Sequence, residues 1–278
     1  MDQDATLIRL AVFGMPVKHS LSPRIHGLFA EQAGLDIEYR AIETCEEFLA
    51  REVQALADSG GRGCNITMPL KQRAFDLANR ASDRARLAGA ANTLLFETPS
   101  RWKADNTDGI GLVRDLARQM DGTLAGSRIA IVGAGGAVAG VLGDLLAENP
   151  ENVFIFNRTE KRARALSERF SELGKINSGT LADMENGAEF DLVINATSMT
   201  RKSDTALPDM RMLAPSSLLY DLNYGQAHES LATWAHKKNI RCIDGRGMLV
   251  EQAAQSFFLW TGFRADTGPV IEALQNPG

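Results

Sequence analysis

The chain has 278 residues, enough for one large domain or two smaller ones with a sizeable core. Its apolar fraction of 44% and its charged fraction of 23% are typical of a globular protein. A net charge of -5 gives no electrostatic support for binding nucleic acid or an acidic membrane, so neither partner is expected.

The cysteines and the start of the chain bear on the compartment. Cys45, Cys64 and Cys242 lie far apart, without the spacing of a metal site or a disulfide framework. We therefore expect no bound metal and a reducing compartment. Residues 1–4 carry no basic segment of the kind that begins a signal peptide, and the longest uncharged run, 129–143, is too short to cross a bilayer. Both observations favour a cytoplasmic protein.

The first half of the chain alternates short apolar runs with helical patterns. Strands are predicted at residues 8–13, 37–42 and 63–66, and a hairpin at 92–96 and 102–104. Helices are predicted from Ser22 to Gly34, over 46–57, from Pro69 to Leu77 and after Thr107. The Ser22 hydroxyl is expected to cap the first helix, with Pro23 at its first position.

The second half repeats the order of strand and helix more regularly. Strands are predicted at residues 129–132, 153–156, 192–195 and 218–222, and helices at 136–147, 159–170 and 247–260. This rhythm is typical of parallel strands with helices on the faces of the sheet, and so predicts an α/β fold. We place the boundary between two domains near residue 109, where a loop enters a helix.

A glycine-rich turn follows the strand at 129–132. It reads Gly133-Ala134-Gly135-Gly136-Ala137 and leads into the helix at 136–147. Glycines at such a turn let the backbone approach a pyrophosphate closely, and the helix start offers that anion free N–H groups. The turn departs from the pattern G-x-G-x-x-G, because Val138 stands where the third glycine is expected. Alone, it is a weak signal for a dinucleotide.

The end of the next strand indicates which dinucleotide is bound. Folds that bind NAD usually carry an acidic residue there, which holds the ribose hydroxyls. Here the strand ends in Asn157-Arg158-Thr159, without a carboxylate, and Lys161 and Arg162 follow just beyond. Arg158 can stack on adenine and bond a 2′-phosphate with Arg162 beside it, so NADP(H) is predicted. The alternative is a merely solvated helix start, which is less favoured because cations are mildly unfavourable at a helix N-terminus.

Two polar clusters follow predicted strands in the first half. One spans residues 65–71 and ends in Lys71, and the other spans 104–109 and contains Asp108. Polar side chains at the carboxyl ends of strands in open α/β sheets face the ligand crevice. Reduction of a ketone needs a proton for the new alkoxide, which a lysine held by a carboxylate can supply. The plain alternatives are a surface lysine and an aspartate that caps a helix.

Several short motifs occur in a defined order along the chain. They are Gly14-x-Pro16-x-x-His19-Ser20-x-Ser22-Pro23-x-x-His26, Asn65-Ile66-Thr67-x-Pro69-x-Lys71, Gly89-Ala90-Ala91-Asn92-Thr93, Asp105-Asn106-Thr107-Asp108-Gly109, Gly133-Ala134-Gly135-Gly136-Ala137, Asn157-Arg158-Thr159, Asn195-Ala196-Thr197-Ser198 and Asp244-Gly245-x-Gly247-Met248-Leu249-Val250-x-Gln252-Ala253-Ala254. Together they resemble the shikimate dehydrogenase family from Phe13 to Gly262. Such an ordered set is far more specific than any single motif.

The resemblance implies reversible reduction of 3-dehydroshikimate to shikimate by NADPH, in aromatic amino-acid (chorismate) biosynthesis. It implies an α/β protein of two domains. Residues 1–109, to which 246–278 return, form an α/β domain that binds the substrate and carries catalysis, and residues 110–245 form a Rossmann-like parallel-sheet domain for NADP. The implied partners are these small molecules, and the protein is expected to be a monomer or a homodimer.

The family's functional positions can be carried over residue by residue. Lys71 and Asp108 match the catalytic pair, and Ser20 and Ser22 match serines that bind the substrate carboxylate. The implied substrate-binding residues are Ser20, Ser22, Thr67, Lys71, Asn92, Asp108, Tyr224 and Gln252. The implied cofactor-binding residues are Asp83, Gly133, Ala134, Gly135, Gly136, Ala137, Asn157, Arg158, Thr159, Glu160, Lys161, Arg162, Leu222 and Gly245. The histidines His19 and His26 are expected to be structural, and His228 and His236 belong to no visible constellation.

Some positions depart from the family's usual pattern. Residues 225–230 stand where a Pro and a Thr-Pro pair are common, and Thr200 stands where Gly is usual. Leu222 replaces a common Met and Arg246 an apolar residue, so both bear on the nicotinamide pocket and on turnover.

Three alternative functions stay open at this point. They are a quinate/shikimate dehydrogenase that uses NAD, a homologue that acts on an aminated relative of shikimate, and a non-catalytic NADP(H) sensor. The sequence Asn157-Arg158-Thr159 opposes a preference for NAD, and the intact Lys71 and Asp108 oppose the sensor.

Overall fold

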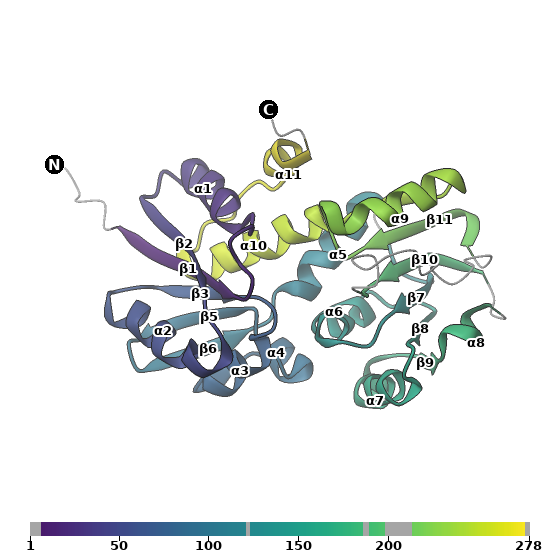
Figure 1. Cartoon of the computed structure of the whole chain (residues 1–278), viewed down its shortest axis with the longest axis horizontal. Coiled ribbons are helices and arrows are strands. Elements are labelled where there is room, and N and C mark those ends of the chain that lie inside the picture. Colours follow the sequence, from purple (N-terminus) through teal and green to yellow (C-terminus); the bar gives the residue numbers. More distant parts are fainter. Residues whose placement is uncertain (1–6, 121–122, 186–188, 198–212, 276–278) are drawn as a thin grey trace. The chain divides into compact units, whose positions relative to one another are not determined.

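The computed structural model describes residues 7–120, 123–185, 189–197 and 213–275, and the chain divides into two compact units (Figure 1). Unit 1 comprises Met1–Gly111 and Val250–Gly278, and unit 2 comprises Leu112–Leu249. The chain passes from one unit to the other inside helices α5 (Asp108–Gln119) and α10 (Arg246–Thr261).

Unit 1 contains a mixed six-stranded sheet in the order β2-β1-β3-β5-β6-β4. The strands are β1 (Ile8–Gly14), β2 (Ile37–Glu43), β3 (Gly63–Ile66), β4 (Arg80–Ala81), β5 (Thr93–Thr98) and β6 (Arg101–Asp105). β1 pairs in parallel with β2 and β3, whereas β5 is antiparallel to β3 and β6. Thr93 lies opposite both Asn65 and Asp105, so the end of β3, the start of β5 and the end of β6 meet at one edge of the sheet.

Helices cover both faces of this sheet. They are α1 (Ser22–Ala33), α2 (Glu46–Asp58), α3 (Lys71–Leu77), α4 (Asp83–Ala88), the second part of α10, and α11 (Gly268–Gln275). On one face, α2, α3 and α4 share a core cluster with Phe13 and Leu94. On the other face, Trp260 of α10 packs with Leu10, and the successive side chains of β1 thus reach both cores.

Unit 2 contains a six-stranded sheet whose described pairings are all parallel. Its strands are β7 (Arg128–Val132), β8 (Asn152–Phe156), β9 (Ile176–Gly179), β10 (Phe190–Asn195), β11 (Leu213–Asp221) and β12 (Arg241–Ile243), in the order β12-β11-β10-β7-β8-β9. This is the strand order of a Rossmann fold, and it reverses between β7 and β10. The glycine-rich turn follows β7 and therefore lies at the switch point where such sheets bind ligands. The predicted α/β fold with a parallel Rossmann-like sheet is confirmed.

Helices also cover both faces of the second sheet. The remaining helical elements are α6 (Gly136–Ala147), α7 (Glu160–Phe170), the 3-10 turn η1 (Ser171–Leu173), α8 (Leu181–Glu185) and α9 (Gln226–Lys237). Leu219 of β11 shares a core cluster with Leu231 of α9. Its neighbour Tyr220 points to the opposite face, where its hydroxyl donates to Asp115 Oδ2 of α5 at 2.6 Å.

Two helix starts differ from their predictions. Leu21 already has helical backbone angles and occupies the N-cap of α1, so Ser22 lies one residue too late to cap, and no side chain caps this helix. The predicted start of α3 at Pro69 is also wrong. Residues 67–70 form a separate turn, closed by a bond from the Leu70 N–H to the Thr67 carbonyl (3.0 Å), and α3 begins at Lys71.

Candidate functional site

An ion pair between Lys71 and Asp108 lies at the edge of the sheet in unit 1. Lys71 begins α3 and Asp108 begins α5, and the Lys71 Nζ lies 2.5 Å from Asp108 Oδ2. The Lys71 side chain is 23% exposed and that of Asp108 only 8%. The lysine is therefore neither a free surface charge nor fully removed from solvent. A half-buried ammonium held by a carboxylate can donate a proton to an alkoxide or stabilise it.

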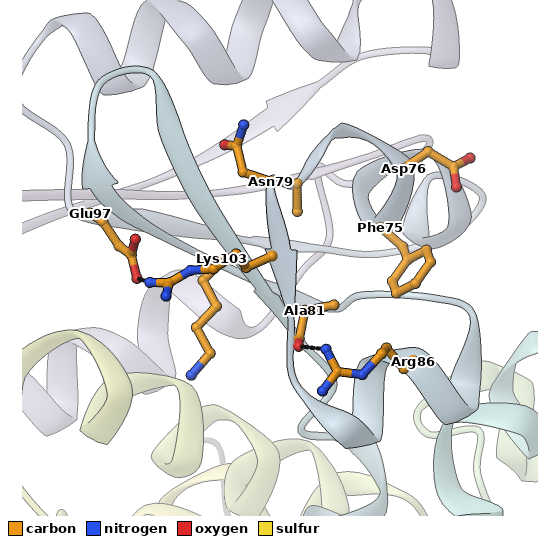
Figure 2. A pocket seen from close by; sticks show the side chains of 9 residues that line it. Phe75, Asp76, Asn79, Ala81, Arg86, Glu97 and Lys103 are labelled. Atoms are coloured by element: carbon orange, nitrogen blue, oxygen red, sulfur yellow. Dashed lines mark hydrogen bonds and ion pairs between the residues drawn. The ribbon is translucent and has the colours of Figure 1, made fainter.

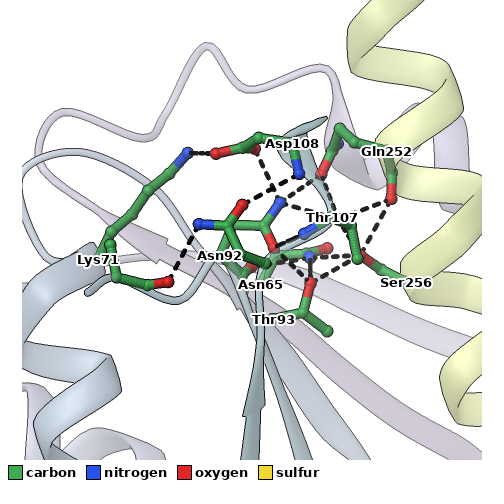
Figure 3. Close-up of polar contacts among 10 residues, drawn as sticks. Asn65, Lys71, Asn92, Thr93, Thr107, Asp108, Gln252 and Ser256 are labelled. Atoms are coloured by element: carbon green, nitrogen blue, oxygen red, sulfur yellow. Dashed lines mark hydrogen bonds and ion pairs between the residues drawn. The ribbon is translucent and has the colours of Figure 1, made fainter. Parts of the chain in front are cut away.

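The amide of Asn92 holds the other side of this pair (Figure 3). Its Nδ2 donates to Asp108 Oδ1 and to Thr107 Oγ1, both at 2.8 Å, and to Gln252 Oε1 at 3.0 Å. Its Oδ1 accepts the Thr107 backbone N–H at 2.8 Å. Both oxygens of Asp108 are thus engaged by donors. The structure brings together four of the predicted residues, namely Lys71, Asn92, Asp108 and Gln252.

A second layer of hydroxyls and amides lies beneath these residues. Ser256 Oγ contacts Thr93 Oγ1 at 2.8 Å and Thr107 Oγ1 at 3.1 Å, and it accepts from Asn65 Nδ2 at 3.1 Å. Ser256 and Thr93 are both fully buried. Neither was predicted as a site residue, although Ser256 stands one helical turn after Gln252. Buried networks of this kind rigidify a site when each member finds a partner.

The remaining predicted residues of unit 1 lie near the same strand ends. Ser22 is buried at the start of α1, and its backbone N–H donates to Ser20 Oγ at 3.2 Å. Thr67 follows β3 and is half-buried. Residue 14, at the end of β1, must be glycine for Thr67 to fit, because a Cβ at residue 14 would lie 2.2 Å from the Thr67 methyl group. Asp83 is exposed at the start of α4 and pairs with Arg86 at 2.5 Å.

His26 belongs to an aromatic cluster under this network. It is fully buried and stacks on Tyr39, with ring centroids 4.3 Å apart. Asn65 Oδ1 accepts from the Tyr39 hydroxyl at 2.7 Å and lies 3.2 Å from His26 Nε2. His26 Nδ1 has no partner within the described part of the chain. Burial lowers the pKa of His26 from 6.5 to about 3, so the ring is neutral at ordinary pH.

This depressed pKa makes stability depend on pH. Between pH 3 and 6.5 the unfolded chain binds a proton at residue 26 that the folded chain does not, so stability falls as the pH falls through this window. We expect the wild-type protein to lose about 2 kcal/mol more than His26→Gln between pH 7 and pH 5. Urea unfolding at both values measures the difference. His236→Gln, at an exposed histidine, should behave as wild type; an equal loss in His26→Gln would show that His26 titrates normally.

The glycine turn in unit 2 forms an open backbone cradle. Gly133 has a φ of 121°, in the region that favours glycine, and a Cβ there would lie 3.0 Å from the Ala196 carbonyl oxygen. A Cβ at Gly135 or Gly136 would meet nothing within 4 Å, so this side of the turn is open space. Helix α6 begins at Gly136 without a side-chain cap, and its first N–H groups are available to an anion. Ala134 is half-buried and Ala137 exposed.

Basic side chains stand beside this cradle at the end of β8. Asn157 Nδ2 donates to the Thr159 carbonyl at 2.9 Å and shapes the turn into α7. Arg158, Lys161 and Arg162 are exposed, and none forms an ion pair with another described residue. Glu160 is engaged by Arg164 at 2.8 Å. The open space at Gly135 and Gly136, with exposed basic side chains nearby, fits the phosphate groups of a phosphorylated dinucleotide.

Comparisons with known proteins agree with this geometry. Family models match residues 12–94 (shikimate dehydrogenase substrate binding domain), 115–215 (shikimate / quinate 5-dehydrogenase) and 245–275 (shikimate 5′-dehydrogenase C-terminal domain). The chain belongs to the shikimate dehydrogenase family.

Individual members of the family match over most of their length. A Chromohalobacter salexigens protein named shikimate dehydrogenase (NADP(+)) is 48% identical over 268 residues, which cover 96% of this chain and 97% of that protein. The crystal structure of an Ael1 enzyme from Pseudomonas putida has a TM-score of 0.89 and 41% identity, covering 96% and 98% of the two chains. The Thermus thermophilus shikimate 5-dehydrogenase, solved with NADP(H) and shikimate, has a TM-score of 0.81 and 31% identity, covering 96% and 98%.

Two of the positions that depart from the shikimate dehydrogenase pattern, Leu222 and Arg246, have identifiable contacts in the structure. Arg246 pairs with Asp244, with Nε 3.1 Å from Oδ2, and so has a partner at the start of α10. Leu222 is half-buried beside Gly245, where a Cβ would lie 2.6 Å from the Leu222 carbonyl oxygen. Tyr224 is half-buried in unit 2. Ser198 and Thr200 lie outside the described residues.

A separate pocket of about 660 Å³ lies in unit 1, away from these residues (Figure 2). Its lining comprises Phe75, Asp76, Ala78, Asn79, Arg80, Ala81, Arg86, Glu97 and Lys103. Two of its cations are engaged, since Arg80 pairs with Glu97 and Arg86 donates to the Ala81 carbonyl. None of the residues carried over from the shikimate dehydrogenase family as catalytic or substrate-binding lines it.

The described residues contain neither a cluster of metal ligands nor a membrane-spanning helix. No group of three or more His, Cys, Asp or Glu side chains could hold a metal ion there. Within the same residues, no helix is both long and apolar enough to pass through a membrane.

Proposed function

We propose that this protein is an NADP-dependent shikimate dehydrogenase, which reversibly reduces 3-dehydroshikimate to shikimate in chorismate and aromatic amino-acid biosynthesis. The observation that carries the proposal is the Lys71–Asp108 pair, fixed by Asn92 at the edge of a sheet. The names of the Chromohalobacter and Thermus relatives support the substrate and the cofactor. Three free cysteines support a cytoplasmic location.

The proposed substrate site uses hydroxyl, amide and charged groups of unit 1. Ser20 and Ser22 would hold the carboxylate of the substrate. Thr67, Asn92 and Gln252 would bond its ring hydroxyls, and we assign Tyr224 of unit 2 as a further contact. A site built to bond hydroxyls rejects analogues that lack them, because its polar groups would then be left unpaired. We accordingly assign substrate binding and catalysis to unit 1.

The proposed cofactor site uses unit 2, with Asp83 as a further contact. The backbone of Gly133–Ala137 would hold the pyrophosphate, and Asn157–Arg162 the adenosine 2′-phosphate, while Leu222 and Gly245 would flank the nicotinamide. The open space above Gly135 and Gly136 fits this group, because a side chain at either residue would fill it. Bound NADPH would supply a hydride to the substrate carbonyl.

The proposed mechanism assigns the proton to Lys71. As the carbonyl oxygen gains negative charge, the Lys71 ammonium would donate its proton to that oxygen. Asp108 holds Lys71 in place, since its Oδ2 lies 2.5 Å from Nζ while its Oδ1 is held by Asn92. In the reverse direction the neutral Lys71 amine would accept the proton from the substrate hydroxyl.

A single assay tests this proposal against a quinate/shikimate dehydrogenase that uses NAD and against a non-catalytic sensor. Oxidation of shikimate and of quinate is measured with NADP⁺ and with NAD⁺. We expect the highest kcat/KM for shikimate with NADP⁺. Parity or a preference for NAD⁺ would contradict the cofactor assignment, and a preference for quinate the substrate. Binding of NADPH without turnover of either acid would favour a sensor.

Arg158 is expected to select NADP over NAD. Arg158→Ala should raise the KM for NADP⁺ about 10- to 150-fold, the scale of one lost charge-assisted hydrogen bond, and leave kcat/KM with NAD⁺ nearly unchanged. Steady-state kinetics with both cofactors measure this. Arg169→Ala, at an exposed arginine near the end of the same helix, over the Phe170 ring, is the matched control and should match wild type. Equal effects on both cofactors would remove Arg158 from 2′-phosphate recognition.

A further inference from the structure

Asp221 is a fully buried carboxylate at the end of β11 in unit 2. Its Oδ1 accepts from Asn195 Nδ2 at 3.0 Å, from Asn223 Nδ2 at 2.9 Å and from the Asn223 backbone N–H at 3.1 Å. Its Oδ2 lies 2.9 Å from His228 Nδ1. We assign His228 Nδ1 as the donor in this contact, because the carboxylate oxygen serves as the acceptor. Within the described part of the chain, Oδ2 receives its side-chain hydrogen bond from His228 alone.

His228 closes a short loop onto the strand that precedes it. It is the third residue of α9, and its side chain is 14% exposed. The loop between the two partners, residues 222–227, carries Leu222 and Tyr224, to which we assigned cofactor and substrate contacts. Gly225 allows the turn with a φ of 61°, and its carbonyl accepts the His228 backbone N–H at 2.9 Å.

Hydrogen bonds also fix the first two residues of the loop. The Leu222 N–H donates to the Asn195 carbonyl at 2.9 Å, and Asn223 Nδ2 donates to the Thr197 carbonyl at 2.9 Å. The Asn223 carbonyl accepts from the Gly245 N–H at 3.0 Å. These bonds hold the start of the loop, whereas His228 holds its far end. Tyr224 lies between the two anchors.

We propose that His228 is a positioning residue, whose bond to Asp221 fixes the loop 222–227 and thereby orients Tyr224 toward the substrate. This role rests on the proposed function. Without the imidazole, a buried carboxylate oxygen would lose its donor, and a buried acceptor without a partner is costly enough to shift nearby groups. The loop would then open to reach water, and Tyr224 would move with it.

The test compares variants that keep or lose the donor. His228→Asn places an amide N–H where Nδ1 stands, whereas His228→Leu removes the donor and keeps an apolar body. We expect His228→Leu to raise the KM for shikimate about 10-fold with kcat changed less than about threefold, which is the pattern of lost substrate binding. His228→Asn should stay close to wild type. His236→Leu, on the exposed face of the same helix, is the control and should have no effect.

Hydrogen exchange of the loop amides gives a readout that needs no turnover. Exchange at residues 222–227 should be about 10-fold faster in His228→Leu, and unchanged in His228→Asn, because exchange reports local opening. Should His228→Leu fail to fold, His228→Ala replaces it in both measurements. Unchanged exchange, an unchanged KM despite faster exchange, or an asparagine variant as impaired as the leucine variant would each overturn the proposal. If wild type does not oxidise shikimate, the proposed function fails while exchange still decides the role of His228 in the loop.

Discussion

Lys71→Ala is expected to lower kcat for shikimate oxidation by about 10²-fold or more, with a smaller effect on KM. The Lys71 Nζ is the charged donor at Asp108, and no other described side chain donates to Asp108 Oδ2. Alanine therefore removes the proton donor and also leaves a carboxylate that is only 8% exposed without its cation. Steady-state kinetics in both directions measure the loss.

The control for Lys71→Ala is a lysine outside the site. Lys175 is exposed just before β9, and Lys175→Ala should leave kcat and KM unchanged. Far-UV circular dichroism and thermal unfolding establish that both variants are folded. If Lys71→Ala retains the wild-type kcat, Lys71 has no part in proton transfer.

Gly63→Ala is expected to destabilise unit 1 by about 3 kcal/mol, the upper part of the range for overpacking a core. A Cβ at residue 63 would lie 2.2 Å from the Leu94 carbonyl oxygen and 2.3 Å from Trp260 Nε1. These two atoms already form a hydrogen bond of 3.0 Å, so the methyl must separate β3 from β5 or displace α10. Both movements would also disturb Asn65, two residues further along β3.

Gly27→Ala provides a matched substitution with the opposite expectation. Gly27 is exposed within α1, and a Cβ there would meet nothing within 4 Å. Because alanine is the better helix former, this variant should be more stable by about 0.5–1 kcal/mol. Urea unfolding of the two variants measures the contrast. Equal stabilities would show that the contact at Gly63 is relieved at little cost.

Helices and strands with a regular apolar pattern could be predicted from the sequence. Short strands that are defined only by their hydrogen bonds to a neighbouring strand could not. In unit 2, strands β7, β8, β10 and β11 and helices α6 and α7 appear in the sequence as apolar runs and helical patterns. β4 has only two residues, and its identity as a strand depends on its partner β6. The same applies to β12, whose three residues pair with β11.

The candidate catalytic residues could be predicted from sequence motifs, but the residues that hold them in place could not. Lys71 and Asp108 stand 37 residues apart, and the ordered motifs were needed to pair them. Ser256 lies in an apolar helical pattern, and nothing in the sequence indicates that its hydroxyl meets Thr93 and Asn65. His228 and Asp221 stand only seven residues apart. Their contact depends on the backbone angles at Gly225, which a sequence pattern does not specify.

The two stretches of chain that form unit 1 have a consequence for synthesis. A ribosome makes Met1–Gly111 before unit 2, whereas Gln252, Ser256 and Trp260 emerge only after unit 2. Until then Leu10 lacks its apolar partner on α10, and Asn65 and Asn92 lack their bonds to Ser256 and Gln252. Unit 2 is continuous and can be completed earlier, although domains generally fold in the order in which they emerge. Synthesis of unit 1 thus begins before that of unit 2 and is completed after it.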